Sequence, residues 1–239
     1  MEKQIRSRKR VIDHGEVMTS EREVNAMLDL VKQETERVDS RFLEPACGDG
    51  NFLAEILRRK LEAAKRMAVP PRKKRPLPRE YERQSVIAVA SIYGVDILMD
   101  NVVACRERLY AIWNNHYMEI CKDEISEDCR KSVRFILSKN IVCGNALSLK
   151  KVDAAGNDTA EPIIFSEWTF ITGNKMQKRD YRFDKLLAGD YEALNQIKQA
   201  ETEKDFQQDL FGQDEEDVND EGEFLKSCIA DYRRFGDNA

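Results

Sequence analysis

The fold of this chain is decided by the stretch Phe42-Leu43-Glu44-Pro45-Ala46-Cys47-Gly48-Asp49-Gly50-Asn51-Phe52-Leu53. A short apolar run leads into Glu44, a tight turn with two glycines follows, and a helical pattern of apolar residues then begins. The sequence therefore predicts a strand, a glycine loop and a helix, as in α/β proteins. Glycine lets the backbone approach a ligand closely and adopt a positive φ. A phosphate-binding Walker loop needs Gly-Lys-Ser/Thr, whereas Glu44 and Asp49 suit a cationic or hydroxyl-rich ligand better.

Residues 44–52 resemble the first motif of S-adenosylmethionine-dependent DNA adenine-N6 methyltransferases of restriction-modification systems, which usually reads D/E-P-A-C-G-S/T-G-x-F/L. Asp49 replaces the usual Ser or Thr. The resemblance implies a Rossmann-like class I methyltransferase fold, S-adenosyl-L-methionine as cofactor and DNA as partner. The alternative interpretation is an ordinary strand-to-helix turn of a doubly wound sheet. By the resemblance, the cofactor is contacted in this motif by Glu44, Pro45, Ala46, Gly48 and Gly50.

An upstream segment, residues 14–20, resembles the family's N-terminal cofactor motif, usually G-x-[FY]-T-P followed by a helix. Thr19 stands where a side chain contacts the methionine end of the cofactor, while Met18 and Ser20 replace the usual aromatic residue and Pro. Ser20 and Glu23 also have the spacing of a capping box, so the segment reads equally well as a helix N-terminus. The two interpretations are compatible.

Two further motifs follow in the family's order. Val86 to Val95 is rich in β-branched and small apolar residues, which predicts a buried parallel strand that ends at Asp96. A carboxylate there can accept the hydroxyl hydrogens of a ribose, as it does in the family, although a helix N-cap is the alternative. After a second predicted strand over Val133 to Val142, residues 144–147 resemble the family's G-D/N-A/S-L. The resemblance makes Asn145 the residue that hydrogen-bonds the cofactor adenine.

The family's catalytic tetrapeptide, N/D-P-P-Y/F, does not occur in this chain. In the family the Asn side chain and a Pro carbonyl accept hydrogen bonds from the target amine, and the aromatic ring stacks on the extruded base. Residues 171–174 resemble the preceding I-I-G-N, which makes Asn174 the catalytic candidate, but Lys175-Met176-Gln177 stands where Pro-Pro-Tyr belongs. The loop thus lacks the stiffness of two prolines and a stacking contribution of roughly 1–3 kcal/mol. The nearby aromatic residues also fit the packed core of a strand, namely Phe165, Trp168 and Phe170.

A basic, Pro-rich segment over residues 67–84 is predicted to be an insertion loop between the first helix and the next strand. We expect it to lie beside the cofactor cleft and to follow a DNA phosphate backbone through Arg72, Lys73, Lys74 and Arg75. A solvated loop without a partner is the alternative. The net charge of −5 argues against general nucleic-acid affinity, so the distribution of charge matters more than its sum.

Cysteine spacing and hydropathy argue against other classes of function. The six cysteines include no Cys-x-x-Cys pair, and neither histidine accompanies a cysteine cluster, so the sequence predicts no metal site. The chain shows no signal peptide and no long apolar run. We therefore expect a cytoplasmic protein with reduced thiols and no membrane partner.

The last part of the chain is predicted to be helical and acidic. Asp100 to Ile120 predicts a crossover helix, and further helices are expected over Phe183 to Lys204 and Glu223 to Phe235. Asp214 to Glu223 is acidic enough to be disordered. Residues 207–211 resemble the bacterial sliding-clamp-binding pentapeptide, with a chance amphipathic stretch as the alternative. Clamp contacts would be made by Gln207, Leu210 and Phe211.

Three parts of the chain are thus predicted. Residues 1–40 carry the upstream cofactor motif on a helix, residues 41–187 form a methyltransferase-like core, and residues 188–239 form a helical, acidic and partly disordered tail. About four strands are recognisable, fewer than the family's sheet contains, so the fold is expected to be truncated. A partner subunit would then supply specificity or catalysis.

The function implied is adenine-N6 methylation of DNA with S-adenosyl-L-methionine, in a restriction-modification or mobile-element context. One alternative is a catalytically degenerate cofactor-binding subunit or regulator on the same fold. A second is a non-enzymatic adaptor that associates with DNA. The sequence leaves open whether the target is DNA, RNA or protein.

Overall fold

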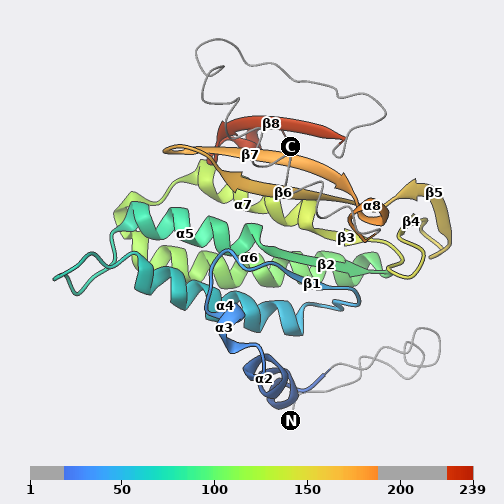
Figure 1. Ribbon diagram of the computed structural model, residues 1–239, viewed down its shortest axis with the longest axis horizontal. Coiled ribbons are helices and arrows are strands. Elements are labelled where there is room, and N and C mark those ends of the chain that lie inside the picture. Colours follow the sequence, from blue (N-terminus) through green and yellow to red (C-terminus); the bar gives the residue numbers. More distant parts are fainter. Residues whose placement is uncertain (1–18, 188–224, 239) are drawn as a thin grey trace.

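The computed structural model describes residues 19–187 and 225–238, which form a mixed α/β fold with three small sheets (Figure 1). The helices are α2 (Glu21–Asp29), α3 (Lys32–Thr35), α4 (Asn51–Met67), α5 (Pro78–Ala90), α6 (Met99–Cys121), α7 (Glu127–Asn140) and α8 (Phe183–Leu187), with the 3-10 helices η1 (Lys122–Glu124) and η2 (Phe235–Asn238). The strands are β1 (Phe42–Glu44), β2 (Ile92–Asp96), β3 (Ile141–Cys143), β4 (Lys150–Val152), β5 (Asp158–Pro162), β6 (Ile164–Phe170), β7 (Lys175–Arg182) and β8 (Lys226–Asp231).

A parallel sheet in the order β1-β2-β3 positions the candidate site. Phe42 lies beside Ile92, and Gly94 lies beside Ile141, so the three strands share one direction and end at one edge. Parallel neighbours need long crossover connections, which α4 with α5 and α6 with α7 supply. The face that carries Gly94 packs against α4, where a Cβ on Gly94 would lie 2.9 Å from a methyl carbon of Leu53.

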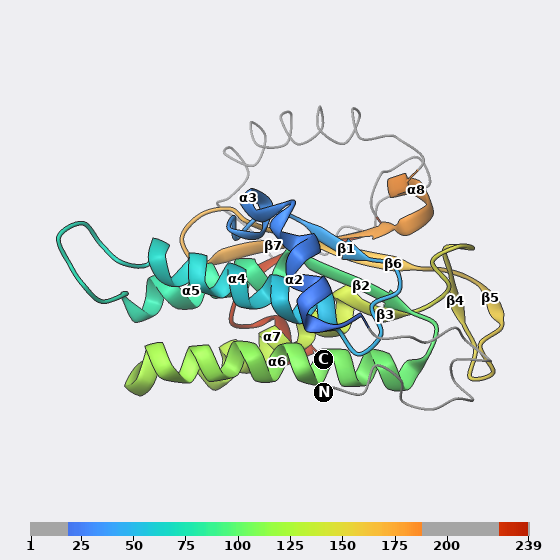
Figure 2. The same ribbon diagram turned by 90° about the horizontal axis from the view of Figure 1, so that it is seen from below.

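An antiparallel sheet in the order β6-β7-β8 forms a second layer, which lies over α5 and α7 (Figures 1 and 2). Its strand β6 also meets the parallel sheet, since Tyr93 packs edge-on against Phe165 with ring centroids 5.5 Å apart. The hydroxyl of Tyr93 donates a hydrogen bond of 3.1 Å to the carbonyl oxygen of Ser166. Trp168 donates from Nε1 to Oδ1 of Asn140 on α7 at 2.9 Å. The expected core role of Phe165 and Trp168 is therefore confirmed, because both side chains are buried.

Two segments predicted as long strands begin as helices and become strands only near their carboxyl ends. Over Val133 to Val142, α7 continues to Asn140 and only the last residues enter β3. Buried residues recur at helical spacing through α7, which places them on one face that reaches the core. Over Val86 to Val95, α5 continues to Ala90 for the same reason. This helix begins at Pro78, and proline is favourable as the first residue of a helix. The carboxyl ends of the predicted strands, and thus Asp96, are nevertheless placed as expected.

Two helical predictions are confirmed. Ser20 caps α2 in a capping box with Glu23, whose carboxylate accepts from the Ser20 backbone N–H at 3.1 Å. The crossover helix expected over Asp100 to Ile120 is α6. Both succeed because capping and helical periodicity act over a few residues.

The terminal helix expected over Glu223 to Phe235 is wrong. Residues 226–231 form β8, which pairs with β7 from Lys226 opposite Asp180 to Asp231 opposite Lys175. Strand β7 would otherwise present an unpaired edge, and β8 satisfies its backbone groups. The described residues contain eight strands rather than about four, and residues 226–231 share a sheet with 164–182, across the boundary predicted at residue 188.

A buried carboxylate ties this C-terminal segment to the helices. Glu82 on α5 is 1% exposed and accepts a hydrogen bond from the hydroxyl of Tyr232 at 2.5 Å. Arg233 donates to the same carboxylate from Nε at 2.6 Å, and the hydroxyl of Tyr117 on α6 donates to its other oxygen. Glu82 therefore joins three segments that are far apart in the chain.

Candidate functional site

Three of the predicted cofactor residues lie at the carboxyl ends of neighbouring parallel strands. Glu44 ends β1, Asp96 ends β2 and Asn145 follows β3 by two residues. The backbone N–H of Gly144 donates to the carbonyl oxygen of Asp96 at 3.0 Å, which joins the last two strand ends directly. In open α/β sheets ligands bind outside this edge, so the strand order gathers the candidate residues where a ligand is expected.

The glycine loop is anchored to β2 beneath it. The N–H of Cys47 donates to the carbonyl oxygen of Val95 at 2.9 Å, and the N–H of Gly50 donates to that of Cys47 at 2.8 Å. Gly48 has a φ of +53° and Gly50 a φ of +91°, both in the region that glycine favours. The loop residues Pro45 and Ala46 are exposed and lie in the same turn. The two glycines thus let a tight, anchored loop precede α4.

We expect Gly50→Ala to lower the free energy of unfolding by about 2–4 kcal/mol, because a positive φ and overpacking add up there. The added Cβ would lie 2.7 Å from Sγ of Cys105 on α6. Gly48→Ala is the matched control, since its Cβ would meet nothing within 4 Å and only the strain of φ remains. Gly48→Ala should lower the free energy of unfolding by about 1–2 kcal/mol. Urea unfolding of both variants measures the difference, and equal losses would contradict the packing argument.

Asp96 is 9% exposed and holds the loop and the next helix together. Its Oδ2 accepts from the N–H of Gly48 at 2.9 Å. Its Oδ1 accepts from the N–H of Leu98 at 2.8 Å and from Nδ2 of Asn101 at 3.2 Å. These hydrogen bonds occupy three of the roughly four acceptor positions of a carboxylate. As far as the described part of the chain goes, one position therefore remains on Oδ2, beside the glycine loop.

Glu44 is a half-buried carboxylate that lacks a cationic partner in residues 19–187 and 225–238. Its Oε1 accepts a hydrogen bond of 3.4 Å from the N–H of Ala46. Burial raises the pKa of Glu44, and that hydrogen bond opposes the rise. A carboxylate in this state gains from a bound cation, because the cation replaces the water that burial has removed. The chemistry of the site therefore favours a ligand with a positive group.

Two of the predicted cofactor residues are Thr19, which precedes β1 in the sequence, and Asn145, which follows β3. Asn145 donates from Nδ2 to Oδ1 of Asp158 on β5 at 3.0 Å and accepts at Oδ1 from the N–H of Leu147 at 3.0 Å, so its amide is oriented by β5 and by the loop that precedes β4. The carbonyl oxygen of Thr19 accepts from Nδ2 of Asn51 at 3.2 Å, which places Thr19 at the start of α4. Thr19 of the upstream motif thus lies beside the glycine loop, while residues 14–18 of that motif lie outside the described residues.

Arg108 on α6 is a site residue that the sequence did not reveal. Its Nη1 donates to Oδ1 of Asp49 at 3.2 Å and to Oδ1 of Asn51 at 2.5 Å. This contact explains the carboxylate that replaces the family's usual hydroxyl in the loop, because Asp49 is bound by a guanidinium. No local signal could reveal it, since Arg108 stands inside a helix with no special spacing to the loop.

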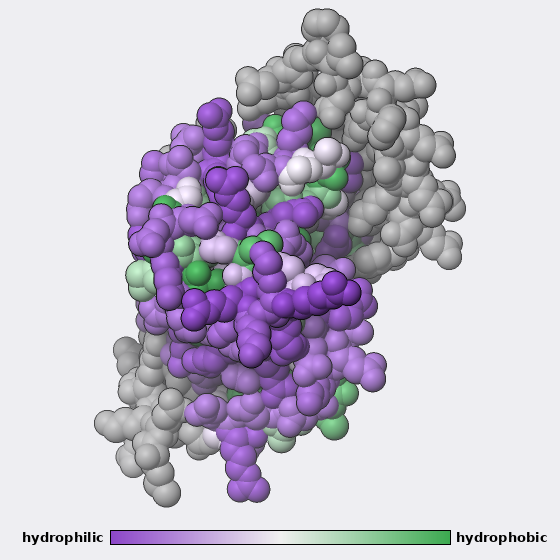
Figure 3. All heavy atoms as spheres, turned by 90° about the vertical axis from the view of Figure 1, so that its left-hand side faces the viewer, coloured by the Kyte–Doolittle hydropathy of each residue, from purple (hydrophilic) through white to green (hydrophobic). Residues whose placement is uncertain are grey.

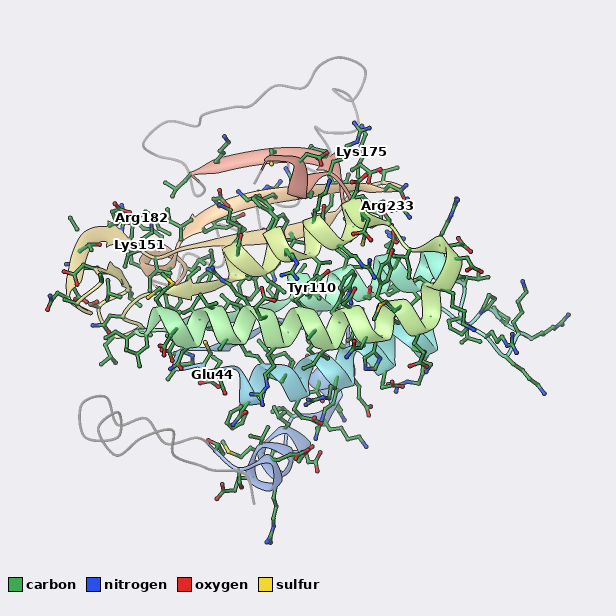
Figure 4. All side chains as sticks on the ribbon, turned by 180° about the vertical axis from the view of Figure 1, so that it is seen from behind. Glu44, Tyr110, Lys151, Lys175, Arg182 and Arg233 are labelled. Atoms are coloured by element: carbon green, nitrogen blue, oxygen red, sulfur yellow. The ribbon has the colours of Figure 1, made fainter. Side chains whose placement is uncertain are left out.

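The catalytic candidate Asn174 is not brought to this edge. It lies in the tight turn between β6 and β7, where the N–H of Lys175 donates to the carbonyl oxygen of Thr172 at 2.9 Å. Figure 4 shows Lys175 and Arg233 in the upper right part of the molecule and Glu44 in the lower left part, with the helices between them. Strand β6 runs from the glycine-loop end to that far end, so its final residues point away from the strand ends of the parallel sheet. The geometry therefore does not support a role for Asn174 beside the cofactor.

The basic segment is also placed differently from expectation. Arg72, Lys73, Lys74 and Arg75 are exposed, as predicted, but they connect α4 to α5 at the end of α4 that is remote from the glycine loop (Figures 1 and 2). A helix of 17 residues is about 25 Å long, so the loop does not border the candidate site. The second half of the predicted insertion is helical from Pro78 onward.

Some expectations concern features that the described residues do not hold. Gln207, Leu210 and Phe211 lie outside these residues, so the clamp contact stays a prediction, as does the acidic segment. Of the helix expected over Phe183 to Lys204, the described part is α8 (Phe183–Leu187), and the rest stays a prediction. Within residues 19–187 and 225–238, no group of His, Cys, Asp or Glu side chains is arranged to hold a metal ion. None of the helices in those ranges combines the length and apolar character needed to cross a bilayer.

Comparison with known proteins identifies one matching family. Residues 18–213 match the family model described as MmeI, DNA-methyltransferase domain. Neither the curated proteins nor the solved structures contain a match. The matched range includes the glycine loop, the three strand ends and the basic loop.

Proposed function

This chain belongs to the MmeI DNA-methyltransferase domain family, and we propose that it binds S-adenosyl-L-methionine for methylation of adenine N6 in DNA. The observation that carries the proposal is the half-buried Glu44 without a cationic partner in the described residues, beside Asp96 and Asn145. S-adenosylmethionine carries positive groups at its methionine end, a ribose diol and an adenine amino group. The carboxylate of Glu44 suits the positive groups, the carboxylate of Asp96 suits the ribose hydroxyls, and the amide oxygen of Asn145 suits the adenine amino group.

Each residue of the edge has a proposed task. Glu44 attracts the positive methionine end, where Thr19 and the loop backbone at Gly48 and Gly50 complete the contacts, with Pro45 and Ala46 in the same turn. Asp96 accepts from a ribose hydroxyl at its remaining position on Oδ2. Asn145 turns its oxygen from Leu147 to the adenine amino group. The bound cofactor supplies an electrophilic methyl group, which the target amine accepts.

The three parallel strands are consistent with one half of the sheet of a Rossmann-like methyltransferase. We propose that β1-β2-β3 is one half of a Rossmann-like sheet, since strand order and direction bring the cofactor motifs to one edge. Transfer also requires acceptors for the hydrogens of the target amine. Asn174 does not lie at this edge, so a partner subunit is the proposed source of the catalytic loop and of sequence specificity.

A second candidate is a cofactor-binding subunit or regulator that does not itself catalyse transfer. The absence of an Asn-Pro-Pro or Asp-Pro-Pro sequence favours it, as does the position of Asn174. The adaptor that associates with DNA without the cofactor is the third candidate. Glu44, which has no cationic partner in the described residues, argues against this adaptor, because a half-buried carboxylate without a ligand is unfavourable.

Two measurements on the full chain separate the three candidates. Calorimetric titration with S-adenosylmethionine is expected to give a dissociation constant in the micromolar range. Radiolabelled methyl transfer to duplex DNA, followed by nucleoside analysis, then tests for N6-methyladenine. Binding with transfer supports the enzyme, and binding without transfer supports the regulator. Absence of cofactor binding would contradict the proposal and leave the adaptor.

A further inference from the structure

A cavity of about 260 Å³ lies at the start of α5, remote from the glycine loop. Three arginines line it, Arg79 and Arg83 from α5 and Arg233 from the segment after β8, together with Glu80, Tyr232 and the β6–β7 turn at residues 173–174. Figure 3 looks onto this end of the molecule, whose surface is mainly hydrophilic. None of the cofactor residues proposed above belongs to the cavity.

Arg83 is the cation of this cavity that lacks a counter-charge. Within residues 19–187 and 225–238 its guanidinium makes no hydrogen bond or ion pair, and its Nε is buried without an acceptor. The guanidinium lies over the ring of Phe170, 5.0 Å from the centroid. The ring holds the guanidinium in place without using its N–H donors. A buried donor without an acceptor is unfavourable and indicates a ligand that accepts hydrogen bonds.

The other two arginines of the cavity are paired with carboxylates. Arg233 is paired with Glu82, and Arg79, whose side chain is 85% exposed, is 3.6 Å from Glu124. Glu80 is the acidic residue on the wall, and its Oε1 accepts from Nε2 of Gln84 at 2.8 Å. Together with Glu82 and Glu124, Glu80 brings the carboxylates to three against three guanidinium groups, so Arg83 is the cavity arginine that has no ion pair among residues 19–187 and 225–238. The first turn of α5 adds the positive end of a 13-residue helix.

The basic loop adds unpaired positive charge in the described residues close to the start of α5. Residues 72–75 lie two residues before the start of α5, and all four of their side chains are basic and exposed. Arginine binds phosphate through paired N–H donors, and asparagine side chains and backbone N–H groups are common additional donors to DNA phosphates. A cavity that combines Arg79, Arg83 and Asn174 next to such a loop has the donors and the charge that a phosphodiester requires.

We propose that this cavity binds a backbone phosphate of duplex DNA, with Arg83 as the central donor and Arg79 and Asn174 beside it. The inference rests on DNA being the partner of this chain, as its family implies. Asn174 then contacts DNA at a distance from the cofactor instead of the target amine. The basic loop continues the same contact along the strand.

The test measures duplex binding by fluorescence anisotropy at several salt concentrations, with the full chain. Arg83→Gln is expected to weaken binding about tenfold and to reduce the slope of log K against log salt by about 1, the loss of one phosphate contact. Arg134→Gln is the matched control, because Arg134 also stacks on an aromatic ring, 3.6 Å from the centroid of Tyr110, but does not line the cavity. It removes the same charge and should leave the slope unchanged.

Arg79→Gln is a second variant that does not threaten folding, since that side chain is largely exposed. It should lower the salt slope in the same way. Equal slopes for Arg79→Gln, Arg83→Gln and Arg134→Gln would overturn the proposal. The proposal would also be overturned if inorganic phosphate bound at a site that requires Arg83 while the affinity for duplex DNA did not depend on Arg83. The cavity would then bind free phosphate and not DNA.

Titration of the same preparations with S-adenosylmethionine separates this proposal from the proposed function. If all variants bind the cofactor normally and bind duplex DNA with equal slopes of log K against log salt, only the phosphate site in the cavity is overturned. If the wild-type chain binds no duplex DNA, both the phosphate site and the proposal that DNA is the partner are overturned. Loss of cofactor binding with the slope effect intact would overturn the cofactor site alone.

Discussion

Asp96→Asn is expected to weaken S-adenosylmethionine binding by about 30- to 100-fold. The proposed ribose contact uses a carboxylate, and a hydrogen bond to a charged group contributes about 2–3 kcal/mol. The amide retains one acceptor oxygen for the N–H of Leu98, while its nitrogen would meet the N–H of Gly48, which now donates to Oδ2. Calorimetric titration of both proteins measures the ratio of dissociation constants.

The control for this substitution must separate ribose recognition from damage to the loop. Asp100→Asn removes the same charge four residues later at an exposed position and should leave affinity nearly unchanged. A cofactor analogue that lacks the ribose hydroxyls gives the decisive comparison. The wild type should prefer the ribose form, and Asp96→Asn should lose that preference. An equal loss of affinity for both forms would show that Asp96 acts only by holding Gly48 and Leu98.

Glu82→Ala is expected to lower the free energy of unfolding by about 3–5 kcal/mol, the largest effect on stability expected among these variants. The substitution leaves the hydroxyls of Tyr117 and Tyr232, both buried, without their acceptor. It also leaves the guanidinium of Arg233 without its carboxylate. Urea unfolding measures the change.

Glu80→Ala is the matched control on the same helix. Glu80 is partly exposed and contacts Gln84, so its removal should change stability by less than about 0.5 kcal/mol. Hydrogen exchange adds a local readout, because Glu82→Ala should expose the amides of β8 before those of α4. Uniform exchange throughout the chain, or a small loss of stability, would mean that Glu82 does not hold the C-terminal segment.

The two ends of the molecule are given different tasks by these proposals. The edge with Glu44 and Asp96 has the chemistry for a cationic, hydroxyl-bearing cofactor, and the cavity at Arg83 has the chemistry for an anion. Substrate DNA would then be held at the end opposite the cofactor edge as well as near it. The Asp96 and Arg83 substitutions should therefore affect cofactor binding and DNA binding separately.

Features that depend on a few neighbouring residues could be predicted from the sequence. Two glycines after an apolar strand predicted the loop and the start of α4, and Ser20 with Glu23 predicted a capped helix. Regular apolar spacing predicted α6. The order of the motifs also predicted that Glu44, Asp96 and Asn145 follow strands. Each of these depends on backbone geometry within one or two turns, which the local sequence determines.

Features that depend on distant partners could not be predicted in this way. Val86–Ala90 and Val133–Asn140 carry β-branched residues that suit a strand, yet both are helical because the apolar residues around them share one helix face that is buried in the core. Residues 226–231 became a strand because the edge of β7 was unpaired. Asn174 and the loop at residues 72–75 lie far from the cofactor edge because of the directions in which β6 and α4 run. The sequence by itself determined the local motifs and their order, and only the tertiary structure decided which of them meet, since pairing and direction depend on burial and hydrogen bonding between segments far apart in the chain.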